Sequence, residues 1–176
     1  VLCLLACGCA TTREIRRGQA AAAAGRPILA RDHYEAAARL SPTKLKDPEF
    51  IEKLRITRRD AGHAEGCQFA RRKQWDAALR EFAAALELEP GWPPALRSIE
   101  ETRQWAATEL HQQALRDADT GDLKRAGASV IRALTFVPDH AGALQARQSV
   151  KTHETDGTPA TQHYRTARQH VACGFR

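Results

Sequence analysis

The 176-residue chain has few aromatic residues, 6% in all, and little Val, Ile or Tyr, whereas Ala and Arg are abundant. This composition favours helices over strands. No run of about 18 apolar residues is present that could cross a membrane as a helix. With 43% apolar residues and 27 Lys+Arg against 21 Asp+Glu, a formal charge of +6, the chain is too apolar and too weakly charged for general disorder. Its length suits one ordinary domain or a short repeat array.

The short motifs that mark common catalytic and cofactor sites are also missing. The five cysteines form no CxxC or CxxCH pair, so zinc-ribbon, thioredoxin-like and haem-attachment sites are not expected. No GxSxG, glycine-rich phosphate loop or HExxH motif occurs. We therefore expect a protein that is not an enzyme and that carries no cofactor. A regulatory module of a larger protein, with catalysis in an attached domain, stays open as an alternative.

The first ten residues, VLCLLACGCA, combine an apolar stretch with small residues beside cysteines. This segment resembles the end of a bacterial lipoprotein signal, in which a Cys after small residues is lipidated and becomes the mature N-terminus. Cys7, preceded by Leu-Leu-Ala, and Cys9, preceded by Ala-Cys-Gly, are the candidate lipidation sites. The resemblance implies a lipid-anchored protein of the bacterial cell envelope, on the periplasmic face of the outer membrane, because neither cysteine is followed by Asp. An ordinary cleaved signal or a fragment of a core helix are the alternatives.

Three segments of the chain align without gaps at a spacing of 48 residues. Prolines recur at positions 42, 90 and 138, and the turn before each helix falls at positions 25, 73 and 121. In the second copy, apolar residues follow one face of a helix with a period of 3.6 residues, and these are Trp75, Ala78, Phe82, Ala85 and Leu86. Each proline ends its helix, because it has no N–H and its ring clashes with the preceding turn.

A second helix precedes each turn, and it carries a small residue at the same place in all three copies. Gly18, Gly66 and Ala114 occupy this position, and each is followed twelve residues later by an alanine on the next helix. Because antiparallel helices approach closely only where their side chains are small, we expect these pairs of residues to be in contact.

This pattern of small, aromatic, alanine and proline positions resembles the tetratricopeptide repeat (TPR) over about residues 11–140. The residues expected to pack within and between repeats are Gly18, Ala30, Tyr34, Gly66, Phe69, Trp75, Ala78, Phe82, Ala85, Pro90, Ala114, Ala126, Val130 and Ala133. The first copy departs from the family pattern, because Pro27 stands where an aromatic residue follows the turn. The resemblance implies an all-α fold, a TPR-like α-solenoid of three helix-turn-helix repeats.

The spacing itself departs from the family. A TPR has about 34 residues, so each link here carries about 48 − 34 = 14 extra residues. Asp47-Pro48-Glu49 and Pro93-Pro94 have the composition of helix starts. We therefore expect extended first helices over about residues 48–72 and 94–118. A break at Gly62 or Gly66 is the alternative for the first of these.

The expected organisation follows from these boundaries. Residues 1–10 form the signal remnant, and residues 11–153 form the TPR-like array, with repeats at about 11–42, 48–90 and 94–138 and a helix at 141–153. Residues 154–176 begin with a polar loop and continue in a helix with Tyr164, Ala167 and Val171 on one face. This last segment is either a capping element or a truncated fourth repeat.

By the resemblance, the first helix of each repeat lines a concave groove. The groove-facing positions are Ile15, Gln19, Asp60, His63, Cys67, Arg71, His111, Leu115 and Asp119. They are mixed in polarity, and the Lys/Asn set with which some family members clamp a C-terminal carboxylate is absent. We therefore expect a non-enzymatic scaffold that binds another protein or peptide in the groove and reaches the membrane through its lipid anchor. Assembly, secretion, pilus or export machinery would be its setting.

Two other kinds of ligand, a metal ion and a nucleic acid, find less support in the sequence than a protein partner does. His63 with Cys67, and His170 with Cys173, each place two ligands for a soft metal on one helix face. A metal site needs three or four ligands, so no metal is predicted, and a sensor for a metal or small ligand is the alternative function. Arginines gather along the first and third predicted helices, but few aromatic residues remain for base stacking, so no nucleic-acid binding is expected.

Overall fold

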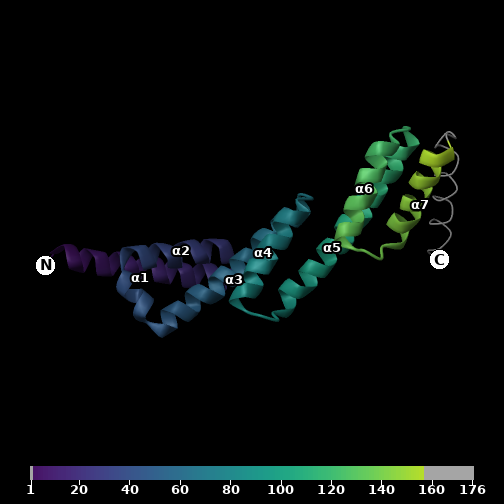
Figure 1. Cartoon of the computed structure of the whole chain (residues 1–176). Coiled ribbons are helices and arrows are strands. Elements are labelled where there is room, and N and C mark those ends of the chain that lie inside the picture. Colours follow the sequence, from purple (N-terminus) through teal and green to yellow (C-terminus); the bar gives the residue numbers. More distant parts are fainter. Residues whose placement is uncertain (1, 157–176) are drawn as a thin grey trace. The chain divides into compact units, whose positions relative to one another are not determined.

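The computed structural model describes residues 2–156, with side chains from residue 9 to residue 152. Within that range every regular element is a helix and no strand occurs, so the expected all-α class is confirmed. The elements are α1 (Leu2–Ala23), α2 (Pro27–Leu40), the short 3-10 helix η1 (Pro42–Lys46), α3 (Pro48–Arg71), α4 (Trp75–Leu88), α5 (Pro93–Asp119), α6 (Leu123–Phe136) and α7 (Ala141–Asp156) (Figure 1). None of the helices in residues 2–156 has both the length and the apolar character that a membrane span requires.

The chain folds as two compact units, Val1–Ile99 and Glu100–Arg176. In the first unit α2 packs against both α1 and α3, and α3 packs against α4. Buried side chains of α2 and α3 form a core cluster of Tyr34, Ala37, Phe50 and Leu54. The rings of Tyr34 and Phe50 lie 5.8 Å apart in it. Since α2 contacts two first helices, it joins the first copy of the repeat to the second.

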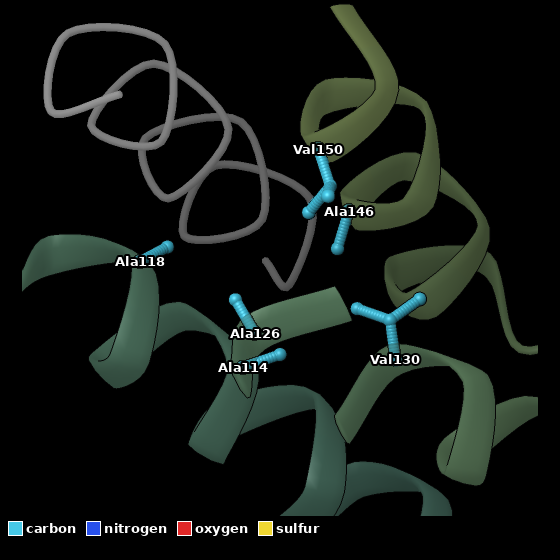
Figure 2. Close-up of a cluster of buried hydrophobic side chains, with 6 residues drawn as sticks. All are labelled: Ala114, Ala118, Ala126, Val130, Ala146 and Val150. Carbon is cyan, nitrogen blue, oxygen red and sulfur yellow. The ribbon is translucent and has the colours of Figure 1, made fainter. Parts of the chain in front are cut away.

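The second unit is built around a core of small side chains. Figure 2 shows Ala114 and Ala118 from α5, Ala126 and Val130 from α6, and Ala146 and Val150 from α7. Four of these six residues are alanines. Helix backbones must approach closely to fill such a core, because alanine reaches only one carbon beyond the backbone.

The turn between paired helices has the same backbone conformation in all three copies. Gly25, Lys73 and Gly121 have positive φ angles of 66°, 58° and 83°. Glycine adopts this left-handed conformation freely, whereas a side chain there costs about 1 kcal/mol. The turn therefore requires a residue with positive φ at the same place in each copy. The first and third copies place a glycine there, and the second copy places a strained lysine.

Asp47 accounts for the start of α3. Its Oδ1 accepts hydrogen bonds from the backbone N–H groups of Glu49 and Phe50, at 3.1 and 3.4 Å. Pro48 follows as the first helical residue, where a missing N–H costs nothing. From there α3 runs unbroken through its two glycines for 24 residues, and α5 has 27. Both long helices are therefore continuous, and the alternative of a break in α3 is not observed.

Paired helices approach closely where a glycine on the first helix meets an aromatic ring on the second. A Cβ placed on Gly66 would lie 2.5 Å from a ring carbon of Phe82. A Cβ on Gly18 would lie 2.9 Å from the ring of Tyr34. Real side-chain atoms do not approach so closely, so only glycine allows these helices their observed separation.

The third copy makes the same contact with different residues. Ala114 stands in place of the glycine, and the smaller Val130 stands in place of the aromatic ring, and both are buried. The larger side chain on α5, alanine in place of glycine, is thus balanced by a smaller side chain on α6, valine in place of an aromatic residue. Of the other residues expected to pack the repeats, Phe69 is half-buried and Pro90 is exposed. The buried ones are Ala30, Trp75, Ala78, Ala85, Ala126 and Ala133.

The C-terminal end of the described chain differs from expectation, whereas the signal-remnant assignment of the first ten residues stays a prediction. Helix α1 begins at Leu2 and continues into the first repeat, so residues 2–10, expected as a signal remnant, are helical. Helix α7 ends at Asp156 rather than at residue 153, so the polar loop does not begin at Glu154. The helix predicted after residue 160 lies outside the described residues.

Gly66→Ala should destabilise the first unit by about 1–3 kcal/mol, because its Cβ would overlap the Phe82 ring. Combining it with Phe82→Val recreates the Ala–Val pair of the third copy. The double variant should therefore cost less than the sum of the two single changes. Urea unfolding followed by circular dichroism measures these free energies.

Gly127→Ala on α6 is the matched control. A Cβ there meets Val150 at 3.6 Å, an ordinary contact, so this change should stabilise the protein by about 0.5–1 kcal/mol through helix propensity. Equal effects of the two glycine substitutions would contradict the proposed contact.

Candidate functional site

A cavity of about 360 Å³ opens in the first unit. The turn between α1 and α2, the middle of α3 and the start of α5 surround it. Its walls are mostly apolar, with three alanines, two prolines and Trp92, and its polar residues are Thr57, Asp60 and His63. Two residues expected to face a groove, Asp60 and His63, therefore meet here. A mostly apolar hollow with a few polar groups is the usual form of a binding pocket.

Trp92 forms one wall, and Arg59 on α3 holds it. The Arg59 guanidinium lies 4.3 Å from the centre of the Trp92 ring. It also donates to Oδ1 of Asp60 at 2.7 and 2.9 Å and to the carboxylate of Glu89. Because only 14% of the Arg59 side chain is exposed, these charge-assisted bonds are little screened by water. Arg59 thus fixes both the aromatic wall and the carboxylate of the cavity.

A second arginine fixes the link between α4 and α5. Arg55 donates to the carbonyl oxygen of Leu88 at 2.6 Å, where α4 ends. It also lies 3.5 Å from the carboxylate of Glu89. Since a helix C-terminus has unpaired carbonyls and a negative partial charge, a cation there is favourable. Both arginines come from α3, so α3 positions the link that supplies Trp92.

His63 lies between the cavity and the start of α5. Its Nε2 is 2.9 Å from Oγ of Ser98. Its ring centre is 5.2 Å from that of Trp92 and 5.4 Å from that of Phe82. Burial lowers the pKa of His63 below its ordinary value of 6.5, so the ring is neutral at pH 7. His63 therefore packs the core as well as lining the cavity.

His111 is the counterpart of His63 in the next repeat, but it is 9% exposed and does not face an open groove. A Cβ placed on Gly142 would lie 2.7 Å from Nε2 of His111, and the ring centre of His140 is 5.6 Å away. Nδ1 of His111 has no hydrogen-bond partner among the described residues. The prediction that His111 faces the groove is therefore corrected, because the start of α7 covers it.

The remaining groove-facing predictions divide between packed and exposed residues. Ile15 packs against the core cluster of α2 and α3, and Leu115 packs against the cluster in Figure 2. Both are partly buried apolar side chains that contribute to the packing between helices. Gln19, Arg71 and Asp119 are exposed, the last two at the C-terminal ends of α3 and α5.

Cys67 stands beside His63, with Sγ 3.9 Å from Nε2, as expected for residues four apart on a helix. Within the part of the chain that the structure describes, no three His, Cys, Asp or Glu side chains are grouped to hold a metal ion. Two ligands are fewer than a zinc site needs. The other predicted pair, His170 with Cys173, lies outside the described residues.

The arginines of α3 form ion pairs within the first unit. Arg55 bonds to Glu52 at 2.8 Å, and Arg58 bonds to Glu35 of α2 at 3.0 Å. Together with the Arg59 contacts, these pairs use much of the positive charge that the sequence concentrates on α3.

Trp92 and Pro94 belong to the cavity but were not predicted. They follow the proline at position 90, and His140 and Gly142 follow the proline at position 138 in the same register. In both copies these residues cover the histidine of the preceding long helix. Trp92 and Pro94 could have been identified from the sequence by extending the 48-residue alignment beyond the prolines at positions 90 and 138.

No protein-family model, curated protein or solved structure matches this chain. What the site can do therefore rests on its geometry. The cavity offers flat apolar walls and one fixed carboxylate, an arrangement suited to binding a side chain of another molecule.

Acidification should destabilise the second unit through His111. Burial, and after it the charge of His140, lowers the pKa of His111 below its ordinary value of 6.5. The unfolded chain therefore binds more protons than the folded one as the pH falls through 6.5, and stability is lost below that pH. His111→Ile, which installs the residue of the first copy, should flatten the change in unfolding free energy between about pH 7.5 and pH 5.5.

Urea unfolding at several pH values provides this measurement. His33→Gln is the control, because His33 contacts Glu14 in the first unit and should leave the contribution of His111 in place. If the unfolding free energy of the His111 variant depended on pH as the wild type does, the burial of His111 would not be the cause of the acid destabilisation.

Proposed function

We propose that this chain is a non-enzymatic scaffold that binds another protein or peptide in a groove of TPR-like helix pairs. A lipid anchor at Cys7 or Cys9 would hold it at the bacterial cell envelope, on the periplasmic face of the outer membrane. The observation that carries the binding role is the cavity beside α3, in which Asp60 and His63 meet apolar walls. Assembly, secretion, pilus or export machinery is the proposed setting.

The recurrence of contacts supports the TPR-like assignment. Each copy has the same left-handed turn and the same pairing of a small residue with a larger one. Helix pairs that repeat their contacts can stack into an extended array with a continuous binding face. In the first unit the cavity lies where the first helices α1 and α3 meet the start of α5, the side expected to bind partners.

The character of the cavity supports a peptide rather than a reacting substrate. Thr57 is bonded to the backbone, His63 to Ser98 and Asp60 to Arg59, and the walls are mostly apolar. Grooves that bind peptides draw affinity from burying a few anchor side chains in such hollows.

The exposed position of Cys9 on α1 supports the anchor. The side chain of Cys7 lies outside the described part of the chain. One acyl chain gives only marginal membrane binding, whereas several chains on a single N-terminal cysteine would hold the protein stably.

A photo-crosslinking residue at Ala22 tests the binding role. Ala22 is exposed and lines the cavity, so illumination in the native cell should capture a discrete envelope protein. The same residue at Ala84, exposed on α4 away from the cavity, is the matched control. Capture of the same proteins from both positions would speak against a binding face at the cavity.

Metabolic labelling with palmitate tests the anchor in a protein expressed from its complete reading frame. Label should enter the wild type and be lost from the double variant Cys7→Ser, Cys9→Ser, and the single variants should identify the modified residue. Cys67→Ser is the control, since Cys67 lies within α3 and should not affect labelling. Label in the double variant would rule out the anchor.

A further inference from the structure

The polar groups of the cavity differ in whether their hydrogen-bonding capacity is used. Thr57 donates through Oγ1 to a backbone carbonyl one turn earlier, at 2.9 Å. His63 is bonded to Ser98 at 2.9 Å. Asp60 accepts both of its hydrogen bonds from Arg59 on a single oxygen, Oδ1. Among the described residues nothing donates to the other oxygen, Oδ2, so Asp60, which lines the cavity with a side chain that is 36% exposed, keeps one acceptor that a ligand can use.

The walls around this acceptor suit a flat ring. Pro27, Pro94 and Trp92 present rings of their own, and alanines of α1, α2 and α3 leave space between them. An aromatic side chain buries about 150–250 Å² and makes favourable contacts with such surfaces. A flexible aliphatic chain would use the flat walls less well and would lose more conformational freedom on binding.

The charge of Asp60 is already paired. Arg59 is 14% exposed and is held by Asp60, Glu89 and Trp92 together. A cation brought to Oδ2 would lose part of its hydration and would also lie near the positive charge of Arg59. A neutral O–H or N–H donor meets neither cost and still forms a hydrogen bond to a charged acceptor.

We infer that the cavity binds one tyrosine or tryptophan side chain of the partner, whose O–H or N–H donates to Oδ2 of Asp60. This inference rests on the proposed binding function and goes beyond it by naming the anchor residue. Phenylalanine has the ring without the donor, and lysine has a donor without the ring. These two residues therefore separate the two features that the cavity recognises.

Four blocked amino acids test this inference by NMR titration of the amide-labelled protein. The probes are N-acetyl-tyrosinamide, N-acetyl-tryptophanamide, N-acetyl-phenylalaninamide and N-acetyl-lysinamide. The tyrosine and tryptophan probes should shift amide signals of residues 57–64 and bind about tenfold more tightly than the phenylalanine probe. Equal affinity for phenylalanine would overturn the role of the donor, and tighter binding of lysine would overturn the aromatic occupant.

Two variants locate the effect. Asp60→Asn keeps the shape of the side chain and should reduce the preference for tyrosine over phenylalanine, whereas Asp76→Asn, an exposed carboxylate on α4, should not. Ala22→Leu should weaken binding of both aromatic probes by narrowing the cavity, with circular dichroism verifying the fold. A tyrosine preference that survives Asp60→Asn unchanged would overturn the assignment of Asp60.

The result also separates this inference from the proposed function. If crosslinking at Ala22 captures a partner but no aromatic probe shifts signals near the cavity, the inference of an aromatic anchor is wrong and the proposed scaffold function is retained. If neither experiment detects binding, both proposals fail.

Discussion

The fit between a small residue on one helix and a larger side chain on its neighbour is the contact on which the rest of this structure depends. It recurs as glycine against an aromatic ring in the first two copies and as alanine against valine in the third. Because this fit sets how closely the paired backbones approach, the surrounding core can be built largely from alanine. The low aromatic content of the sequence is a consequence, since a few rings placed at these contacts suffice.

The segments that link one copy to the next complete the walls of the cavity. The residues that join one copy to the next begin the long helices α3 and α5, and those after positions 90 and 138 cover the histidine of the preceding long helix. In the second copy that segment supplies Trp92 and Pro94, and Arg59 and Arg55 fasten it to α3. The cavity thus depends on the residues that join one copy to the next.

The two histidines in equivalent positions show how link residues change the outcome. His63 meets Trp92 and keeps contact with the cavity. His111 meets His140 and is buried, because Gly142 lets α7 come close to its ring. The same position in the repeat therefore lines a binding hollow in one copy and fills a core in the other.

The sequence by itself determined the helical class, the 48-residue period, the positions of the turns and the start of α3 at Asp47 and Pro48. These features follow from local backbone preferences and from the pairing of adjacent helices, which a single alignment can reveal. Only the tertiary structure decided which of the positions predicted to face a groove are open: it buries His111, packs Ile15 and Leu115 against core clusters, and leaves Asp60 at a cavity. Whether a helix face is exposed depends on which other segments of the chain pack over it. The spacing of apolar residues along that helix does not reveal those segments.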